Sequence, residues 1–447
     1  MKAVIMAGGK GTRLRDMTLS TPKPMIEIAG KPVLQYQIES LKRHGIMDII
    51  IIIGYLGDRI KNYFSNGQKY GVNISYIEEE IPLGTAGALY YLKKIISEDF
   101  LLIYADVFQD VNLYKFIDFH KQKNALATLL VHPNSHPYDS DLVILNRKSR
   151  VIDIDFRGKT RDYYYKNCSN SGLYILNNKI FDYISDIGEK NLEKDIIYKV
   201  IKRNERVYGY KTTEYAKDIG TYERLERAIT DFNMGIVGSK NLSCMQKCIF
   251  TDRDGTINKY WGLIHKPDDF HLEKDVTRAI KMINNSGFLC IVITNQPVIA
   301  MNLCTMEQLD IIHKKLETML GYNGAYLDDI LYCPHYPVSG YANENKEYKI
   351  DCNCRKPKIG LIEKCVEKYN IDISNSYFMG DSTTDIMTGI NAGLKTVLVQ
   401  TGVAGMDKKF DVLADYTFKD LFTAVNTLLN PHNHIAGGVR MADTYII

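Results

Sequence analysis

The sequence lacks the long apolar runs and the charge excess that mark membrane proteins and nucleic-acid-binding proteins. Its 447 residues contain no apolar run long enough to span a bilayer, and the start, MKAVIMAGGKGTRL, turns glycine-rich and charged too early for a signal peptide. Lys and Arg number 56 against 53 Asp and Glu, so the formal net charge is only +3. We therefore expect no nucleic-acid partner, no membrane partner and a cytoplasmic location.

Cysteine is scarce, and its distribution argues against a disulfide framework. The nine cysteines are an odd number spread over a long chain, and a reducing compartment disfavours disulfides. Five stand singly in or beside apolar runs, where we expect buried small apolar side chains: Cys168, Cys248, Cys290, Cys304 and Cys365. The clustered cysteines are then expected to be metal ligands or catalytic groups.

The chain is too long for one ordinary core, and its strand and helix patterns begin twice. The first half starts with KAVIMAG and continues through DIIIIIIG, and the second restarts with KCIFTD and FLCIVITN. Strands that alternate with helices predict an α/β protein with two doubly wound, mainly parallel domains. The expected division is a first domain over 1–232, a linker over 233–246, a second domain over 247–430 and a tail over 431–447.

Three helix ends are predicted from local signals. Pro32 opens a helix that ends at Gly45, and Thr305 with Gln308 forms a capping box before another helix. In parallel sheets, ligands bind beyond the carboxyl ends of the strands. The glycine and aspartate motifs below follow predicted strands at such ends.

A glycine-rich loop with two cations follows the first predicted strand, in AGGKGTRLRDMTLSTPKPM. Glycines let backbone N–H groups approach phosphate oxygens, and a P-loop is excluded because G-x-x-x-x-G-K-[ST] is absent. A plain strand–helix turn is the alternative for the loop alone. Arg13 and Lys23 favour phosphate binding.

The signature G-G-x-G-T-R-L…P-K-P over residues 8–24 resembles the sugar-1-phosphate nucleotidyltransferases, over about residues 1–232. That family joins a sugar phosphate to an NTP and releases pyrophosphate. The resemblance implies that Arg13 contacts the pyrophosphate and that Lys23 neutralises the reacting phosphates. It also implies a phosphate-binding loop of Gly8, Gly9, Gly11 and Thr12.

The same resemblance assigns the remaining parts of this site. PLGTAGAL, with Gly84, Thr85 and Gly87, corresponds to the segment that receives the nucleobase and ribose, in the form typical of mannose and heptose guanylyltransferases, so GTP is expected. Asp106 and Asp218 match the two Mg²⁺-binding carboxylates. The family's Glu-Lys-Pro is missing at the sugar site, where FRGK (156–159) stands instead; Lys159 is a candidate for the missing lysine, and Asn170 and Gly172 for the Asn-x-Gly segment.

Acidic residues follow two strands of the second half. Asp252 and Asp254 in FTDRDGTIN repel each other and need a cation, and Asp381 in MGDSTTD adds a third carboxylate for one Mg²⁺. An Asx-turn is the alternative for D-x-D alone. Thr294 and Asn295 end another strand and offer neutral donors to a phosphate, and Lys356 supplies a fixed positive charge, so the group predicts a phosphate-processing site.

This set resembles the haloacid-dehalogenase-like phosphatases of the heptose bisphosphate and histidinol-phosphate branch, over about residues 247–402. The resemblance implies that Asp252 is the nucleophile, that Asp254 is the general acid and base, and that Lys356 with Mg²⁺ stabilises the transferring phosphoryl group. Asp385 adds a hydrogen-bonding or metal-binding role. Met301 stands where an arginine is common, which bears on substrate affinity.

Two short motifs predict a second metal site. Cys333 and His335 in YCPHYP and Cys352 and Cys354 in DCNCRK each place two ligands on one side of an extended backbone. Together they predict a closed, structural Cys₃His zinc site, with four unrelated residues as the alternative. A nucleic-acid zinc module is disfavoured because no basic recognition helix follows. We expect Arg355, directly behind the site, to contact the substrate.

The two resemblances predict a bifunctional enzyme for consecutive steps. It would remove the C7 phosphate of D-glycero-D-manno-heptose 1,7-bisphosphate and then transfer a nucleotidyl group to the heptose 1-phosphate, with Mg²⁺ at both sites. One alternative keeps both chemistries on another sugar, such as mannose 1-phosphate. Another makes one domain a non-catalytic sugar-nucleotide sensor.

Overall fold

The computed structural model describes residues 1–9, 11–158, 160–340 and 343–430, which belong to two compact units. The first unit is Met1–His132, Ser140–Arg157 and Cys168–Ser243, and the second is Pro133–Asp139, Gly158–Asn167 and Cys244–Ile447. The main division thus falls inside the predicted linker, which also contains a short helix, α7 (Ile236–Ser239). The predicted tail lies outside the described residues.

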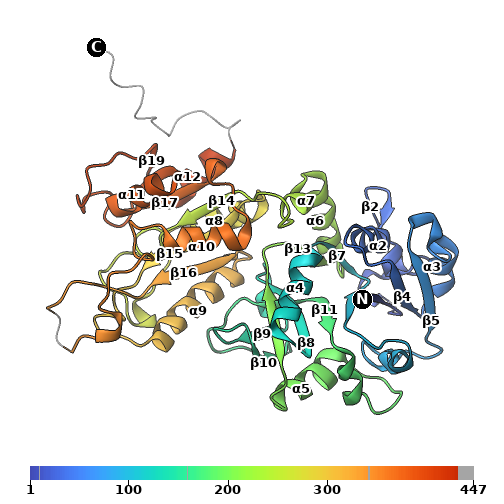
Figure 1. Cartoon of the computed structure of the whole chain (residues 1–447). Coiled ribbons are helices and arrows are strands. Elements are labelled where there is room, and N and C mark those ends of the chain that lie inside the picture. Colours follow the sequence, from blue (N-terminus) through green and yellow to red (C-terminus); the bar gives the residue numbers. More distant parts are fainter. Residues whose placement is uncertain (10, 159, 341–342, 431–447) are drawn as a thin grey trace. The chain divides into compact units, whose positions relative to one another are not determined.

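The first unit is built on a nine-stranded sheet (Figure 1). Its main path runs in the order β10-β9-β11-β6-β1-β4-β5, and β8 pairs with β11 and β12. The strands are β1 (Lys2–Ala7), β4 (Asp48–Ile53), β5 (Asn73–Glu78), β6 (Phe100–Tyr104), β8 (Ala127–His132), β9 (Leu142–Leu145), β10 (Val151–Asp155), β11 (Ser169–Leu176) and β12 (Val207–Lys211). Strands β5, β4, β1 and β6 are parallel, whereas β11 runs antiparallel to β6 and β8. The core is therefore the mostly parallel α/β sheet that the sequence predicts.

Helices and short strands complete the first unit. The helices are α1 (Arg15–Thr18), α2 (Val33–Arg43), α3 (Gly57–Phe64), α4 (Leu113–Lys123), α5 (Tyr198–Lys202) and α6 (Tyr222–Asn233), with a π-helical turn over Leu192–Ile197. The small ladders are β2 (Glu27–Ile28) with β3 (Lys31–Pro32) and β7 (Val107–Asp110) with β13 (Tyr215–Asp218). Helix α2 begins after Pro32 and ends before Gly45 as predicted, and its apolar face is fully buried at Leu34, Ile38 and Leu41.

The second unit has a six-stranded parallel sheet in the order β16-β15-β14-β17-β18-β19. Its strands are β14 (Cys248–Thr251), β15 (Leu289–Asn295), β16 (Asp329–Cys333), β17 (Tyr377–Gly380), β18 (Lys395–Val399) and β19 (Tyr416–Phe418). Its helices are α8 (Val276–Asn285), α9 (Met306–Tyr322), α10 (Gly360–Tyr369), α11 (Thr383–Ala392) and α12 (Leu421–Leu429). Helices α8, α9 and α12 share one apolar cluster with the sheet, and none of the described residues of α10 or α11 belongs to that cluster. The predicted capping box of Thr305 and Gln308 opens α9.

Each sheet reverses its strand order once, and the motifs lie at these reversals. In the first unit the chain passes from β1 outward to β4 and β5 and returns to the other side of β1 at β6. In the second, β14 has β15 on one side and β17 on the other. The glycine-rich loop follows β1, and Asp252 follows β14. Both lie at topological switch points, where ligands of open α/β sheets bind.

Two segments from the middle of the chain belong to the second unit and pack on α9. Tyr165 N–H donates to Thr318 Oγ1 at 2.9 Å, and Lys166 Nζ lies 2.6 Å from Asp310 Oδ1. No local sequence pattern predicted this grouping, because it depends on contacts between residues distant in sequence.

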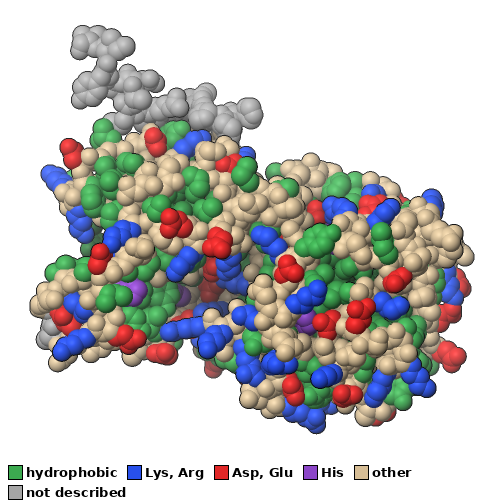
Figure 2. All heavy atoms as spheres, in the orientation of Figure 1, with side chains coloured by type: hydrophobic (Ala, Val, Ile, Leu, Met, Phe, Trp, Pro, Cys, Tyr) green, Lys and Arg blue, Asp and Glu red, His purple; other side chains and the backbone are tan. Residues whose placement is uncertain are grey.

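The surface has mixed charge. On the face in Figure 2, basic side chains are interspersed with acidic ones, in keeping with the small net charge. Among the described residues, no helix is both long and apolar enough to cross a membrane.

Two candidate active sites and a candidate metal centre

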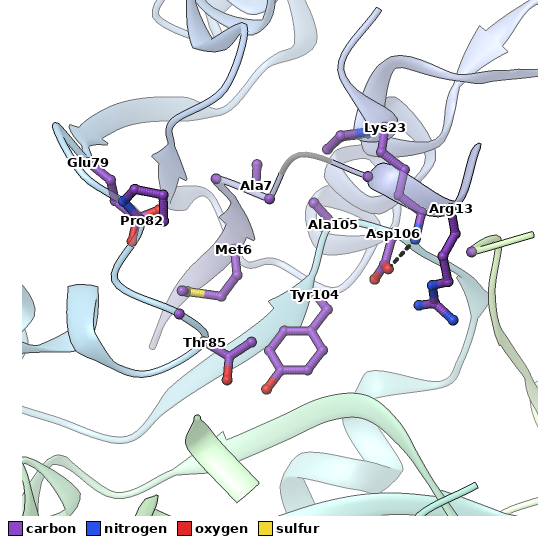
Figure 3. Close-up of a pocket in the computed structure, with 16 residues that line it drawn as sticks. Met6, Ala7, Arg13, Lys23, Glu79, Pro82, Thr85, Tyr104, Ala105 and Asp106 are labelled. Atoms are coloured by element: carbon purple, nitrogen blue, oxygen red, sulfur yellow. Dashed lines mark hydrogen bonds and ion pairs between the residues drawn. The ribbon is translucent and has the colours of Figure 1, made fainter. Parts of the chain in front are cut away.

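A cavity of about 360 Å³ lies beyond the carboxyl ends of β1 and β6 (Figure 3). Glu79 and Pro82 lie on one side of it, Arg13, Lys23 and Asp106 on the other, and Thr85 and Tyr104 below. Eight of the sequence-predicted residues line this cavity: Gly8, Gly9, Gly11, Arg13, Lys23, Gly84, Thr85 and Asp106. The structure therefore brings the main motifs of the first half to one place.

The glycine-rich loop needs glycine partly because side chains approach it closely. A Cβ on Gly8 would clash with Glu79 Oε2. Gly11 has a φ of 65° and would place a Cβ 3.2 Å from Lys23 Cβ. Thr12 begins the short 3₁₀ turn Thr12–Leu14 that follows. The loop backbone is thus held close to a carboxylate and to a lysine stem.

Lys23 is the buried cation of this cavity. The residue is 8% exposed, and its Nζ forms an ion pair with Asp106 (Figure 3). Arg13 is exposed, and a Cβ built on Gly220 would lie 3.2 Å from an Arg13 guanidinium nitrogen. The two predicted cations therefore border the cavity beside Asp106 and the segment after β13.

Asp218 ends β13, next to Asp106 across a backbone hydrogen bond from Ile219 N–H to the Asp106 carbonyl at 3.0 Å. Arg224 Nη1 donates to both carboxylate oxygens of Asp218 at 2.8 Å. Burial alone would raise the pKa of Asp218, but Arg224, the Gly220 N–H and Lys23 hold it below its usual value. Asp106 and Asp218 are thus two carboxylates in adjoining segments, a donor set that suits a hard divalent cation. Sequence reasoning missed Arg224, whose motif position carries no signal for this role.

The PLGTAGAL segment packs closely against the backbone of residues 188–192. A Cβ on Gly84 or Gly87 would clash with the carbonyl of Lys190 or of Gly188. Ala86 N–H donates to the Lys190 carbonyl at 2.9 Å. These two glycines therefore permit close backbone packing; Gly84 also lines the cavity, whereas Gly87 is buried.

The predicted sugar residues lie on β11 and join a buried polar cluster. Asn170 Nδ2 donates to the Tyr174 hydroxyl at 2.5 Å and to Glu193 Oε1 at 3.4 Å. Gly172 has a φ of 83°, and a Cβ there would lie 2.9 Å from the Tyr104 ring. The sequence predicted Asn170 and Gly172 but gave no indication of Tyr104, Tyr174 or Glu193. Lys159 lies outside the described residues.

Glu79 is another residue that the sequence did not indicate. It lines the cavity, and its Oε1 is buried without a hydrogen-bond partner among the described residues. Burial raises the pKa of the Glu79 carboxyl, against the Leu83 N–H, which lowers it. The cavity wall thus includes a glutamate that has one buried carboxylate oxygen without a hydrogen-bond donor among the described residues.

In the second unit, a lysine lies among three carboxylates. Oxygens of Asp252, Asp381 and Asp385 all lie within 4.8 Å of one another. Lys356 Nζ is 2.8 Å from Asp252 Oδ1 and 2.6 Å from Asp385 Oδ1. The structure therefore places Asp252, Asp381 and Lys356 together, as the sequence predicts, and gives Asp385 a place among them.

The carboxylates of this cluster repel one another, and a bound cation would relieve that repulsion. Burial and the neighbouring carboxylates raise the pKa of Asp252 to about 6 against the opposing effect of Lys356, and burial with Asp385 and Asp252 raises the pKa of Asp381 to about 8. Burial opposes the charge of Lys356, yet Asp252 and Asp385 raise its pKa above the usual value. Three clustered carboxylates and one lysine leave excess negative charge, which fits a Mg²⁺ ion.

The Asp254 carboxylate is not part of that trio and is held by hydrogen bonds of its own. Both of its oxygens accept from Arg253 Nη2 at 2.9 Å, Oδ2 accepts from Gln296 at 2.8 Å and Oδ1 from Asn258 at 3.0 Å. Arg253 is fully buried and its Nη1 also contacts His313 Nε2 at 3.1 Å. The predicted acid–base residue is thus firmly oriented, but its side chain is not among the clustered metal-binding oxygens.

Asn295 and Thr294 are engaged with neighbouring residues. The Asn295 side chain accepts from Lys356 N–H at 3.0 Å and donates to the Lys356 carbonyl at 3.2 Å. Thr294 is buried and accepts from Gln296 at 3.0 Å. Asn295 therefore fixes the backbone that presents the lysine.

The predicted cysteine and histidine ligands converge. The Sγ of Cys354 lies 3.3 Å from those of Cys333 and Cys352 and 3.3 Å from His335 Nδ1, and Cys333 Sγ lies 3.5 Å from Cys352 Sγ. These separations exclude disulfides, whose S–S bonds are about 2.05 Å. A tetrahedral zinc with Zn–S bonds of about 2.3 Å needs ligand separations of roughly 3.5–3.8 Å, so the four residues fit a metal site.

Arg355 is tied to this candidate metal loop. Its Nη1 donates to the His335 carbonyl at 2.9 Å, and its guanidinium lies 4.7 Å from the centre of the Tyr336 ring. The next residue is Lys356, so the candidate metal loop leads directly into the phosphatase-like cluster. Met301, at the departure noted in the sequence, is 5% exposed and part of the core.

Comparisons with known proteins agree with this division of the chain. The family model "Nucleotidyl transferase" matches residues 2–234, and the HAD-hydrolase-like model matches residues 353–424. The chain belongs to the nucleotidyl transferase family, and its second half is related to the HAD-like hydrolases.

Individual relatives match one half each. A mannose-1-phosphate guanyltransferase of Yarrowia lipolytica is 34% identical over 233 residues, 49% of this chain and 61% of that protein. A D-glycero-beta-D-manno-heptose-1,7-bisphosphate 7-phosphatase of Haemophilus ducreyi is 37% identical over 186 residues, 40% of this chain and 99% of that protein. This chain thus spans 61% of the length of the guanyltransferase and nearly all of the phosphatase.

Two solved structures are also similar to parts of the chain. HddC from Yersinia pseudotuberculosis, complexed with GMP-PN, is 29% identical with a TM-score of 0.45, covering 52% of this chain and 99% of that one. The D,D-heptose 1,7-bisphosphate phosphatase from B. bronchiseptica is 28% identical with a TM-score of 0.37, covering 42% of this chain and 99% of that one.

Proposed function

We propose that this protein is a bifunctional enzyme of nucleotide-activated heptose formation. Its second half removes the C7 phosphate of D-glycero-D-manno-heptose 1,7-bisphosphate, and its first half transfers GMP from GTP to the resulting heptose 1-phosphate. The observation that carries the proposal is the presence in one chain of the Asp252–Lys356 cluster, in a region 37% identical to nearly a whole heptose bisphosphate phosphatase, and of a nucleotidyl transferase cavity. The product of one site is the substrate class of the other.

In the phosphatase reaction, an Asp252 carboxylate oxygen attacks phosphorus and the bond from phosphorus to the C7 oxygen breaks. Asp254 gives a proton to the leaving oxygen and later takes one from the water that hydrolyses the aspartyl phosphate. Arg253, Gln296 and Asn258 hold the Asp254 carboxylate for both steps. Lys356 stabilises charge on the transferring phosphoryl group.

The carboxylates of Asp252, Asp381 and Asp385 would hold Mg²⁺. When bound, this ion supplies charge neutralisation to the phosphoryl group. Asn295 keeps Lys356 at the same place through its two backbone hydrogen bonds. The chain thus brings a nucleophile, an acid and a fixed cation to one phosphate.

In the nucleotidyl reaction, the sugar phosphate oxygen attacks the α-phosphorus of the NTP and pyrophosphate leaves. Lys23 neutralises the reacting phosphates from its buried position, and Arg13 binds the pyrophosphate at the exposed edge. Asp106 and Asp218 would hold a second Mg²⁺. The loop of Gly8, Gly9, Gly11 and Thr12 presents backbone N–H groups to the phosphates.

Glu79 supports guanine as the base. The Watson–Crick edge of guanine presents N1–H and a 2-amino group side by side, and a carboxylate accepts both. Glu79 lines the cavity together with Gly84 and Thr85, the segment expected to receive the base, and its buried Oε1 has no donor among the described residues. Adenine presents a different edge, with an acceptor at N1, and would repel this carboxylate.

The candidate metal loop would hold structural zinc through Cys333, His335, Cys352 and Cys354. Four protein ligands close the coordination sphere and leave no open position for catalysis. The loop then stabilises the backbone from which Arg355 and Lys356 project. Arg355 lies beside Tyr336 at the edge of this loop, where it contacts the substrate's other groups.

The test is a reaction of the purified protein with heptose 1,7-bisphosphate, GTP and Mg²⁺. We expect one phosphate, one pyrophosphate and one GDP-heptose for each substrate consumed. Turnover with another NTP but not with GTP would overturn the guanylyl assignment.

The mannose-1-phosphate guanyltransferase relative favours a second candidate sugar, mannose 1-phosphate, for the first half. A panel of sugar 1-phosphates with GTP separates the two. A higher kcat/KM with mannose 1-phosphate than with heptose 1-phosphate would replace the heptose assignment of that half.

A further inference from the structure

A buried carboxylate lies below the nucleotidyl transferase cavity and has no role in the chemistry above. Glu193 is in the π-helical turn Leu192–Ile197 and is 8% exposed. Its Oε1 accepts from the Tyr104 hydroxyl at 2.8 Å, from the Tyr174 hydroxyl and from Asn170. Thr85 joins this group because its hydroxyl contacts Tyr104 and accepts from the Leu192 N–H at 2.8 Å. We call Thr85, Tyr104, Asn170, Tyr174 and Glu193 the Glu193 cluster.

Such a group is costly to bury. Burial raises the pKa of Glu193, and the Tyr174 and Tyr104 hydroxyls partly offset this by donating to the carboxylate. A buried charge with incomplete compensation destabilises a fold relative to apolar packing. The structure retains it behind two residues of the cavity wall, Thr85 and Tyr104.

The Glu193 cluster joins two parts of the cavity wall to β11 through side chains. Thr85 belongs to the PLGTAGAL segment and Tyr104 ends β6 two residues before Asp106, whereas Asn170 lies on β11 and does not line the cavity. The Tyr104 and Tyr174 rings pack edge-to-face with centroids 5.6 Å apart. Thr85 and Tyr104 line the cavity (Figure 3). Glu193 is not among the lining residues and contacts the Tyr104 hydroxyl.

The rest of the cavity wall is already assigned. Glu79 and Pro82 lie at one side, suited to the base, and Lys23, Arg13 and Asp106 at the other, suited to the phosphates (Figure 3). The wall formed by Tyr104, beside Asp106, is left for the sugar whose phosphate attacks.

We propose that Glu193 is a positioning residue that holds Tyr104, in the cavity wall, together with Asn170 at the place where the ring of the sugar 1-phosphate binds. This inference rests on the nucleotidyl transfer proposed above. A polyhydroxylated ring needs donors and acceptors at fixed positions, and a hydroxyl loses that fixed position when its acceptor is removed. Loss of Glu193 therefore weakens sugar 1-phosphate binding much more than GTP binding.

The test is the separation of the two KM values in the full-length protein. In Glu193→Ala we expect the KM for sugar 1-phosphate to rise at least about tenfold, which corresponds to about 1.4 kcal/mol, while the KM for GTP stays within about twofold. Glu193→Gln keeps an oxygen that accepts from both tyrosines and should recover most of the affinity. Tyr104→Phe, which removes one hydroxyl, should show the same separation to a smaller degree and serves if Glu193→Ala does not fold.

Glu214→Ala is the matched control. Glu214 is also a buried carboxylate, bound by Asn112 N–H at 2.7 Å and Leu242 N–H at 2.9 Å, and neither it nor these partners line the cavity. This variant should lose stability but keep both KM values.

Three results would overturn the inference: equal rises of both KM values in the Glu193 or Tyr104 variants, no rise in either, or the same separation in Glu214→Ala. A wild-type protein that transfers no nucleotidyl group would instead overturn the proposed function on which the inference rests.

Discussion

At the scale of single residues, the proposed role of Glu79 in base selection makes the most specific prediction. If its carboxylate accepts N1–H and the 2-amino group of guanine, ITP, which lacks that amino group, loses one charge-assisted bond worth about 1.5–3 kcal/mol. We expect kcat/KM for GTP to exceed that for ITP by roughly tenfold to a hundredfold. Glu79→Gln should bring the GTP/ITP ratio of kcat/KM near one. The new amide NH₂ group would face the N–H donors of guanine, so the 2-amino group would no longer gain a hydrogen bond. Equal use of GTP and ITP by the wild type would contradict this role.

The pH dependence follows from the same residue. Burial raises the pKa of Glu79, so protonation begins at a higher pH than for an ordinary glutamate. GTP binds the ionised form, and its KM should therefore rise as the pH falls through this raised pKa. The slope should disappear in Glu79→Gln; a slope unchanged in that variant would assign the titration to another group.

The sequence indicated those residues that lie next to strand ends in short motifs. Lys23, Asp106, Asp252, Asp381 and Lys356 are placed by the local chain, and the structure brings them into two clusters. Glu79, Arg224, Arg253 and Glu193 were missed because their partners are remote or because their role follows from burial. A charged residue in a sequence gives no sign of whether it is exposed or faces a cavity.

At the scale of elements, the loop between β16 and α10 links the candidate metal centre to catalysis. Cys333 ends β16, and Cys354 stands two residues before Lys356. The described residues between them include the short 3₁₀ turn Lys346–Tyr348 and no longer helix, so we expect a metal to supply much of the stability there.

Removal of zinc should therefore act on the second half alone. We expect one zinc per chain by elemental analysis and, after its removal, a fall in the melting temperature of that half on the order of 10 °C with a higher KM for the bisphosphate. Cys352→Ser should behave likewise, and Cys244→Ser, at an exposed cysteine outside the cluster, should keep full zinc content. Unchanged KM after verified loss of zinc would break the link between this loop and Lys356.

The element pattern was predictable wherever periodicity and capping act locally. Helix α2, the Thr305–Gln308 capping box and the mainly parallel sheets follow from the sequence. The grouping of Pro133–Asp139 and Gly158–Asn167 with the second unit did not, because hydrogen bonds such as Tyr165 to Thr318 leave no periodic signal. The short helix α7, within the expected linker, was not predicted because its four residues form no clear apolar face.

At the scale of the whole molecule, the two proposed reactions take place in one chain but use two separate sets of residues. The phosphatase set, Asp252, Asp254 and Lys356, shares no member with the nucleotidyl transfer set, Lys23, Asp106 and Asp218. Removal of one nucleophile should thus leave the other reaction intact.

The most direct test of this claim is a ³¹P NMR time course of Asp252→Asn with each substrate in turn. The account predicts that phosphate release from heptose 1,7-bisphosphate falls at least about a thousandfold, while GDP-heptose forms from heptose 1-phosphate and GTP at a rate within about twofold of the wild type. Parallel loss of both reactions in a folded Asp252→Asn protein would contradict it.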